Sequence, residues 1–274
     1  MADSTRSESP ALSKGAPAPV WQRLRADAKA AAEQEPALAS YLSASVLNHD
    51  TFAEALAYHL AHKAGGKEVG ALQLREICEE AYKHDPSIVA AGERDLQAVL
   101  ERDPACRSTL QPFLYFKGYL ALQTHRVAHW LWSQDREALS FYLQSRVSEL
   151  YGVDINPAAK IGSGVFIDHA TGIVIGETAV VGDDVSMLHG VTLGGTGKDF
   201  TDRHPKIGNG VLLGAGAKVL GNIHVGDEAR VGSGSVVLSD VPSRCSVAGV
   251  PAKPVGGPCA KPSKTMDQNF DPTI

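Results

Sequence analysis

Apolar residues recur at intervals of three and four along the first half of the chain, from Trp21 onward. This spacing puts them on one face of an α-helix. It predicts helices near residues 20–33, 36–48, 51–63, 71–84, 87–102, 112–133 and 136–150, separated by proline and glycine. Residues 1–18 offer little to bury and are expected to be disordered. The pattern therefore predicts an all-helical domain over residues 19–152.

A second pattern begins near Val153. Aliphatic residues recur mostly every sixth position, and eight of them directly precede a glycine. They are Ile155, Ile161, Ile167, Ile175, Val181, Met187, Leu193, Ile207, Leu213, Val219, Val225, Val231 and Val237. A period of six fits neither an α-helix nor an alternating strand, and it predicts a parallel β-helix whose stacked coils bury columns of aliphatic side chains. We therefore expect an α+β chain with a β-helix over residues 153–249 and a flexible tail over residues 250–274.

Two insertions break the six-residue register. Ile167 and Ile175 are eight residues apart, and Leu193 and Ile207 are fourteen apart. Insertions in a solenoid form outward loops, often on its binding face. The second one, which contains GGTGKDFTDRHPK, is therefore the first place to expect chemistry.

Composition narrows the function classes. Charged residues make up 21% of the chain and the net charge is −5, so no basic excess indicates nucleic acid or an anionic membrane as a partner. The four cysteines lack CxxC or metal-ligand spacing, and no apolar run is long enough to span a membrane. These features favour a protein of the reducing cytoplasm.

Six segments carry a specific resemblance: GVDINPAAKIG, IDHATGIVIGETA, VTLGGTG, DRHPKIG, GAGAKVLGN and AGVPAKPVG. They resemble serine O-acetyltransferase of bacterial and plant cysteine synthesis, over roughly residues 100–256. The hexapeptide pattern alone is typical of a broad acyltransferase superfamily, and DHATG together with DRHPKIG is much narrower. The resemblance implies that the β-helix is left-handed.

The activity implied is transfer of acetyl from acetyl-CoA to the hydroxyl of L-serine. That hydroxyl is too weak an acid to ionise at neutral pH, so a positioned base must take its proton. The resemblance assigns this role to His169, with Asp154 holding the imidazole. A GxSxG nucleophile motif does not occur, which agrees with direct transfer without a covalent enzyme intermediate.

The resemblance also implies how the substrates bind. Arg203 would pair with the serine carboxylate, and His204 would act as a second base or an orienting donor. Asp103 and Asp168 would face the amino group, although Asp103 also suits a simple helix end before Pro104. The backbone of Gly194 and Gly195 could stabilise the oxyanion. For acetyl-CoA the matching residues are Gly195, Ala215, Arg230 and Lys253.

Related enzymes bind acetyl-CoA between subunits, so the resemblance implies homotrimers paired into a hexamer. It implies feedback inhibition by L-cysteine, and binding of the terminal Ile274 carboxylate by O-acetylserine sulfhydrylase. No metal is expected. His125 and His129 lie one helical turn apart without a third ligand, which favours packing. His189 and His224 have no predicted partner.

Three alternatives remain at this point. The first is a hexapeptide acetyltransferase that acts on another hydroxyl, such as homoserine or a sugar. The second, a γ-class carbonic anhydrase, requires an HxxxxH pair that the sequence lacks. The third is a noncatalytic scaffold, which the intact DHATG and DRHPKIG motifs disfavour.

Overall fold

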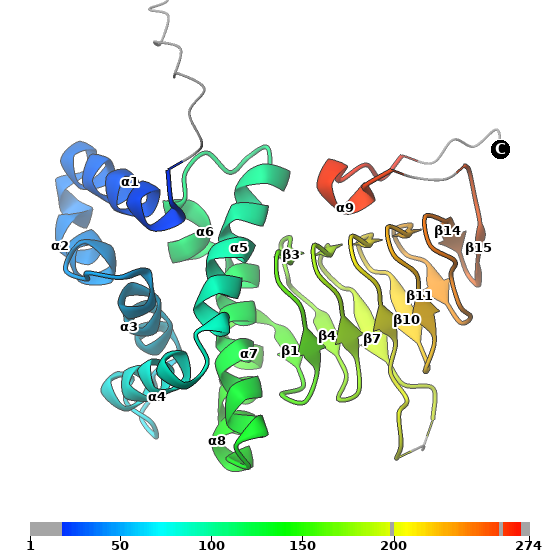
Figure 1. Cartoon of the computed structure of the whole chain (residues 1–274), viewed down its shortest axis with the longest axis horizontal. Helices are drawn as coiled ribbons and strands as arrows, with labels where there is room; N and C mark the ends of the chain where they lie inside the picture. Colours follow the sequence, from blue (N-terminus) through cyan, green and yellow to red (C-terminus); the bar gives the residue numbers. More distant parts are fainter. Residues whose placement is uncertain (1–17, 198–199, 258–259, 270–274) are drawn as a thin grey trace, which may run out of the picture.

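The computed structural model describes residues 18–197, 200–257 and 260–269, and it shows a helical part followed by stacked coils of short strands (Figure 1). The helical part contains α1 (Val20–Gln34), η1 (Pro36–Leu38), α2 (Ala39–Leu42), η2 (Ser43–Leu47), α3 (Phe52–Ala64), α4 (Ala71–His84), α5 (Ser87–Arg102), α6 (Leu110–Tyr115), α7 (Lys117–Ser133) and α8 (Glu137–Tyr151). The short segments η1 and η2 are a 3-10 and a π turn.

The predicted helix over residues 112–133 is wrong in one respect, because it is two helices. The chain is extended at Phe116 (φ −79°, ψ 109°), which separates α6 from α7. Directly after this break, Gly118 lies against the backbone of Ile167, so closely that an added Cβ would be 2.1 Å from the Ile167 carbonyl oxygen. The periodic pattern could not reveal this contact because it lies between the two halves of the chain.

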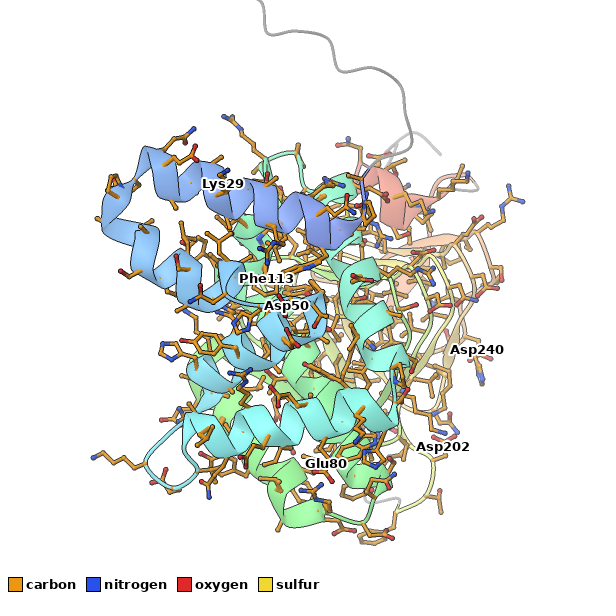
Figure 2. The ribbon with its side chains drawn as sticks, turned by 60° about the vertical axis from the view of Figure 1, so that its left-hand side comes forward. Lys29, Asp50, Glu80, Phe113, Asp202 and Asp240 are labelled. Carbon is orange, nitrogen blue, oxygen red and sulfur yellow. The ribbon has the colours of Figure 1, made fainter. Side chains whose placement is uncertain are left out.

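The helices share an apolar core whose members lie at three- and four-residue spacings. Phe113 is completely buried among them, whereas Lys29 and Glu80 lie on the outside (Figure 2). Each fully buried Leu or Phe side chain stabilises the fold by roughly 1.5–3 kcal/mol. The helical domain thus has a core of its own.

The strands of the second half form three parallel sheets. The first is β1 (Val153–Ile155), β4 (Ile173–Ile175), β7 (Thr192–Gly194), β10 (Lys218–Leu220) and β13 (Val236–Val237). The second is β2 (Lys160–Ile161), β5 (Val180–Val181), β8 (Lys206–Ile207) and β11 (His224–Val225). The third is β3 (Phe166–Ile167), β6 (Ser186–Met187), β9 (Leu212–Leu213), β12 (Arg230–Val231) and β14 (Ser246–Gly249), closed by the antiparallel β15 (Ala252–Pro254).

Strand register explains the six-residue repeat. In the first sheet, Ile155, Ile175, Leu193, Val219 and Val237 are successive pairing partners and form one buried column. Twelve of the thirteen repeat positions are buried, and the remaining one, Ile161, is half-buried against the same core. The predicted parallel β-helix is confirmed. The insertion between Leu193 and Ile207 forms the connection between β7 and β8, as expected.

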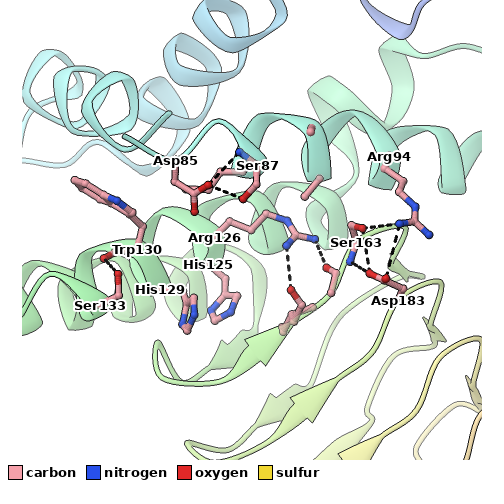
Figure 3. Close-up of a pocket in the computed structure, with 15 residues that line it drawn as sticks. Asp85, Ser87, Arg94, His125, Arg126, His129, Trp130, Ser133, Ser163 and Asp183 are labelled. Atoms are coloured by element: carbon pink, nitrogen blue, oxygen red, sulfur yellow. Dashed lines mark hydrogen bonds and ion pairs between the residues drawn. The ribbon is translucent and has the colours of Figure 1, made fainter. Parts of the chain in front are cut away.

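Polar side chains of α5 and α7 attach the helical domain to the first coil. Arg126 is paired with the buried Asp95 at 2.7 Å. It also donates to the carbonyl oxygens of Ile161 and Gly162, and Figure 3 marks these bonds with dashed lines from Arg126. His129 donates from Nδ1 to the Pro157 carbonyl oxygen at 2.7 Å. Burial lowers the pKa of His125 to about 3, so this ring is neutral. His125 and His129 therefore serve packing, as the sequence indicated.

The described C-terminal residues fold back along the third sheet. Helix α9 (Pro262–Thr265) lies beside α5, and Met266 packs against Val99, Cys106 and Phe166. Within the described ranges, none of the helices combines the length and apolar character needed to cross a bilayer.

Candidate active site

His169 lies at the corner where the chain passes from β3 to β4. Its backbone is left-handed (φ +56°), a conformation that non-glycine residues rarely adopt, and its side chain is 76% exposed. The His189 ring stands edge-on at 6.0 Å between centroids, and the Asp168 carboxylate is 3.8 Å from His169 Nε2. The corner thus presents an imidazole to solvent with a carboxylate beside it.

A second carboxylate approaches this corner from the helical domain. Asp103 is the C-cap residue of α5, and its Oδ1 accepts a hydrogen bond from the Ala105 amide at 2.8 Å. The pKa of Asp168 is raised by burial and by the negative charge of Asp103, while His169 opposes the rise. Two carboxylates held close together form a favourable place for a cationic amino group.

Arg203 and His204 lie together in the loop between β7 and β8. Arg203 pairs with Glu177 at 2.5 Å. His204 is only 8% exposed, and its Nδ1 is 2.9 Å from the Thr178 hydroxyl and 3.2 Å from the Thr178 amide, which donates to it. Burial, followed by the charge of Arg203, lowers the pKa of His204. The amide donor and the lowered pKa both favour a neutral ring whose Nε2 carries the proton.

The two groups lie at opposite ends of β4. His169 precedes this strand, and the His204 ring packs on Gly176, which directly follows it. Among the described residues, no hydrogen bond, ion pair or ring contact joins the corner of His169 to His204. One chain therefore carries two half-sites, one at each end of β4.

Asp154 lies on the outer face of β1, and its recorded hydrogen bond is to neither His169 nor His204. Its Oδ1 accepts from Gln144 Nε2 at 2.6 Å. Among the described residues, no hydrogen bond or ion pair joins Asp154 to His169. The predicted contact between the Asp154 carboxylate and His169 is therefore not seen among the described residues of one chain.

Sequence comparison decides the family. The family described as "Serine acetyltransferase, N-terminal" matches residues 20–124, and "Bacterial transferase hexapeptide (six repeats)" matches residues 204–239. A serine acetyltransferase of Salmonella typhimurium is 54% identical over 92% of this chain and 93% of its own length. The chain belongs to the serine acetyltransferase family.

Solved serine acetyltransferases share the whole architecture. The enzyme from Vibrio cholerae has a TM-score of 0.90 and 56% identity over 92% of this chain and 98% of its own. A serine acetyltransferase in complex with cysteine has a TM-score of 0.91 and 52% identity over 92% of this chain and 98% of its own. The resemblance drawn from the sequence motifs is confirmed.

The residues expected to bind acetyl-CoA are not gathered at one point of the single chain. Gly195 is exposed at the start of the β7–β8 loop, Ala215 lies at the corner after β9, and Lys253 is exposed on β15. Arg230 is buried and donates to the backbone oxygens of Asp267 and Asn269 at 3.1 and 2.8 Å. Arg230 thus holds the described C-terminal backbone through Nη1, and its Nε donates to Ser246 Oγ at 3.1 Å.

Sequence reasoning missed the residues that hold the loop. Thr178 Oγ1 accepts from the backbone amides of Arg203 and His204, both at 3.0 Å, and Glu177 pairs with the Arg203 guanidinium. Glu177 and Thr178 stand in the GETA motif, but nothing in their spacing connects them to a loop some 26 residues away. Only the stacking of successive coils brings the two segments together.

The remaining expectations concern metals and the chain end. In the portion of the chain that the structure describes, no three His, Cys, Asp or Glu side chains are grouped to hold a metal ion. His224 is exposed on β11, and its amide donates to Asp240. Ile274 and Cys259 lie outside the described residues.

Proposed function

We propose that the chain transfers acetyl from acetyl-CoA to the hydroxyl of L-serine and so produces O-acetyl-L-serine for cysteine synthesis. Membership of the family supports this, as do solved members bound to coenzyme A (from Brucella abortus, 50% identical, TM-score 0.86) and to serine (from soybean, 52% identical, TM-score 0.84). The single observation that carries the mechanism is the exposed imidazole of His169, with the Asp168 carboxylate 3.8 Å from its Nε2.

His169 takes the proton from the serine hydroxyl as the oxygen attacks the thioester carbonyl. A new C–O bond forms and the carbonyl π bond opens, which gives a tetrahedral oxyanion. Amides near Gly194 and Gly195 are the proposed donors to it. The C–S bond then breaks, coenzyme A leaves as a thiolate, and the imidazolium returns the proton. Asp154, which retains acceptor capacity beyond its bond from Gln144, is the proposed stabiliser of the imidazolium.

The charges of the two half-sites match an amino acid. Asp103 and Asp168 face the serine amino group, and Arg203 binds its carboxylate, using guanidinium donors in addition to those that hold Glu177. His204, with its ring held by Thr178, donates from Nε2 and orients the substrate. L-cysteine has the same amino and carboxylate groups and would compete for the same contacts, consistent with the family's solved cysteine complex.

We further propose that a complete active site forms between two copies of the chain. The corner with His169 comes from one copy and the loop with His204 from the next, because a single chain holds them at opposite ends of β4. A closed ring of three such interfaces gives the homotrimer, and pairing of trimers gives the hexamer. Gly195, Ala215, Arg230 and Lys253 would contact acetyl-CoA at these interfaces, and Ile274 would bind O-acetylserine sulfhydrylase.

The test of this function is thiol release from acetyl-CoA in the presence of L-serine. Homoserine, threonine and a blank without acceptor are run beside it, and L-cysteine is titrated against serine. We expect release that depends on serine, exceeds that with homoserine or threonine, and is competitively inhibited by cysteine. Release that prefers homoserine, from a folded oligomer, would reassign the acceptor.

A further inference from the structure

Arg102, the last residue of α5, sends its guanidinium into the β-helix. Its side chain is only 2% exposed. Nη2 donates to Asp184 Oδ1 at 3.1 Å, and Nη1 donates to Ser186 Oγ at 3.1 Å, with longer contacts to the carbonyl oxygens of Asp184 and Val185. One buried side chain thus ties the end of α5 to a single corner of the second coil.

Asp184 occupies a left-handed corner of the second coil (φ +56°). The other corners that lead into the third sheet also place one residue in the left-handed region, Gly164 and Gly210 at two of them and Glu228 and Arg244 at two more. A side chain is disfavoured in this conformation but is tolerated at these corners. The use of the Asp184 carboxylate is therefore shown by its contacts and not by its backbone.

That use is a double ion pair with α5. Asp184 Oδ1 accepts from Arg102, and Oδ2 accepts from Arg94 at 3.0 Å. Arg94 also reaches Ser163 and Asp183, as Figure 3 shows. The two arginines differ in environment, since the Arg94 side chain is 46% exposed. Arg94 lies two turns before the end of the helix, whereas Arg102 directly precedes Asp103.

We propose that the Arg102–Asp184 pair positions Asp103 against Asp168 and so sets the site that receives the serine amino group. The proposal rests on the proposed function, in which Asp103 binds serine. Asp103 follows Arg102 directly and caps α5 through a bond from its amide to the Val99 carbonyl oxygen at 2.9 Å. With Arg102 anchored, the helix end cannot slide along the coil. Displacements of about 1 Å are enough to cost an enzyme up to about 100-fold in rate.

The experiment compares Arg102→Gln with Arg94→Gln, its matched control on the same carboxylate. For Arg102→Gln we expect the KM for serine to rise about tenfold, with the KM for acetyl-CoA changed less than about twofold. Arg94→Gln should leave both constants within about twofold of wild type. Arg102→Lys, which keeps the charge but has fewer donors, should give an intermediate serine KM and serves if the glutamine variant does not fold.

Asp103→Asn, alone and combined with Arg102→Gln, separates positioning from a structural role. If Arg102 acts through Asp103, the double variant has the serine KM of Asp103→Asn within about twofold. If the two substitutions raise the serine KM independently, so that their effects multiply in the double variant, the proposal is wrong. It is also wrong if Arg102→Gln lowers the melting temperature and leaves the serine KM unchanged. An unchanged serine KM for Asp103→Asn would contradict the proposed function itself and remove the positioning role with it. A raised KM for Asp103→Asn beside an unchanged one for Arg102→Gln would overturn the positioning role only.

Discussion

The two histidines at the ends of β4 are held in opposite ways. His169 extends from a strained corner and is largely exposed, whereas His204 is buried, lies on Gly176 and is bound through Nδ1 by Thr178. A base must be able to accept and release a proton, which suits the open imidazole. A ring whose proton and orientation are fixed suits the orientation of a substrate. The difference in environment therefore supports the different roles that we propose for two residues of the same type.

The largest expected effect comes from combining two variants that are each impaired. His169→Ala should lower kcat by about 10³-fold, and His204→Ala should lower it by roughly 10- to 100-fold. When the two variants are co-expressed and assemble at random into rings, about a quarter of the interfaces pair an intact His169 with an intact His204. The mixed oligomer should therefore recover about a quarter of the wild-type rate of thiol release.

Each variant co-expressed with itself is the control for this mixing. Recovery above both controls supports a site shared between copies. A mixed oligomer that shows only the average of the two single variants would mean that both histidines act within one chain. That result would contradict the separation of the half-sites.

A smaller effect is expected from Gly176→Ala. An added Cβ would lie 2.0 Å from Cδ2 and Nε2 of His204, so the ring must rotate and lose its bonds to Thr178. Because a side chain rather than backbone is displaced, the fold should persist while kcat falls by about tenfold or more. Steady-state kinetics and thermal unfolding measure the two effects separately.

Gly197→Ala is the matched control, since an added Cβ there has no neighbour within 4 Å among the described residues. It should keep the kinetics of the wild type. If Gly176→Ala also kept them, the orientation of His204 would not matter for catalysis.

Sequence patterns predicted the repeating parts of this molecule far better than its junctions. The β-helix follows from one aliphatic residue in each short strand, because each such residue meets its counterpart in the next coil, as Ile155 meets Ile175. The helix break at Phe116 and the glycine contact at Gly118 depend on a partner some 50 residues away, which no local period contains.

The candidate site shows the same contrast between residues that a local pattern reveals and contacts that depend on distant segments. The motif resemblance named His169, Arg203 and His204, and the structure adds the groups that hold them. Glu177, Thr178 and Gly176 are adjacent in sequence, but their roles depend on a neighbouring coil. The placement of the two half-sites at opposite ends of β4 could not be predicted from spacing either, because spacing does not show which residues of stacked coils come together.

The smallest expected effect concerns the pH dependence of stability. The folded chain lowers the pKa of His204 below its ordinary value of about 6.5, chiefly by burial. Between the two pKa values the unfolded chain binds more protons, so the contribution of His204 to stability is complete above about pH 6.5 and is lost as the pH falls. The loss for one histidine at pH 5 is at most about 2 kcal/mol. Urea unfolding of wild type and His204→Gln at pH 7 and pH 5, at equal protein concentration, measures it.

His59 and His125 add losses of the same sign, because burial lowers their pKa values to about 4 and about 3. Both remain in His204→Gln, so the difference between variant and wild type isolates His204. We expect the variant to lose less stability on acidification than wild type. Equal losses would show that His204 is as easily protonated in the folded as in the unfolded chain, and burial of its ring would then not favour the neutral form.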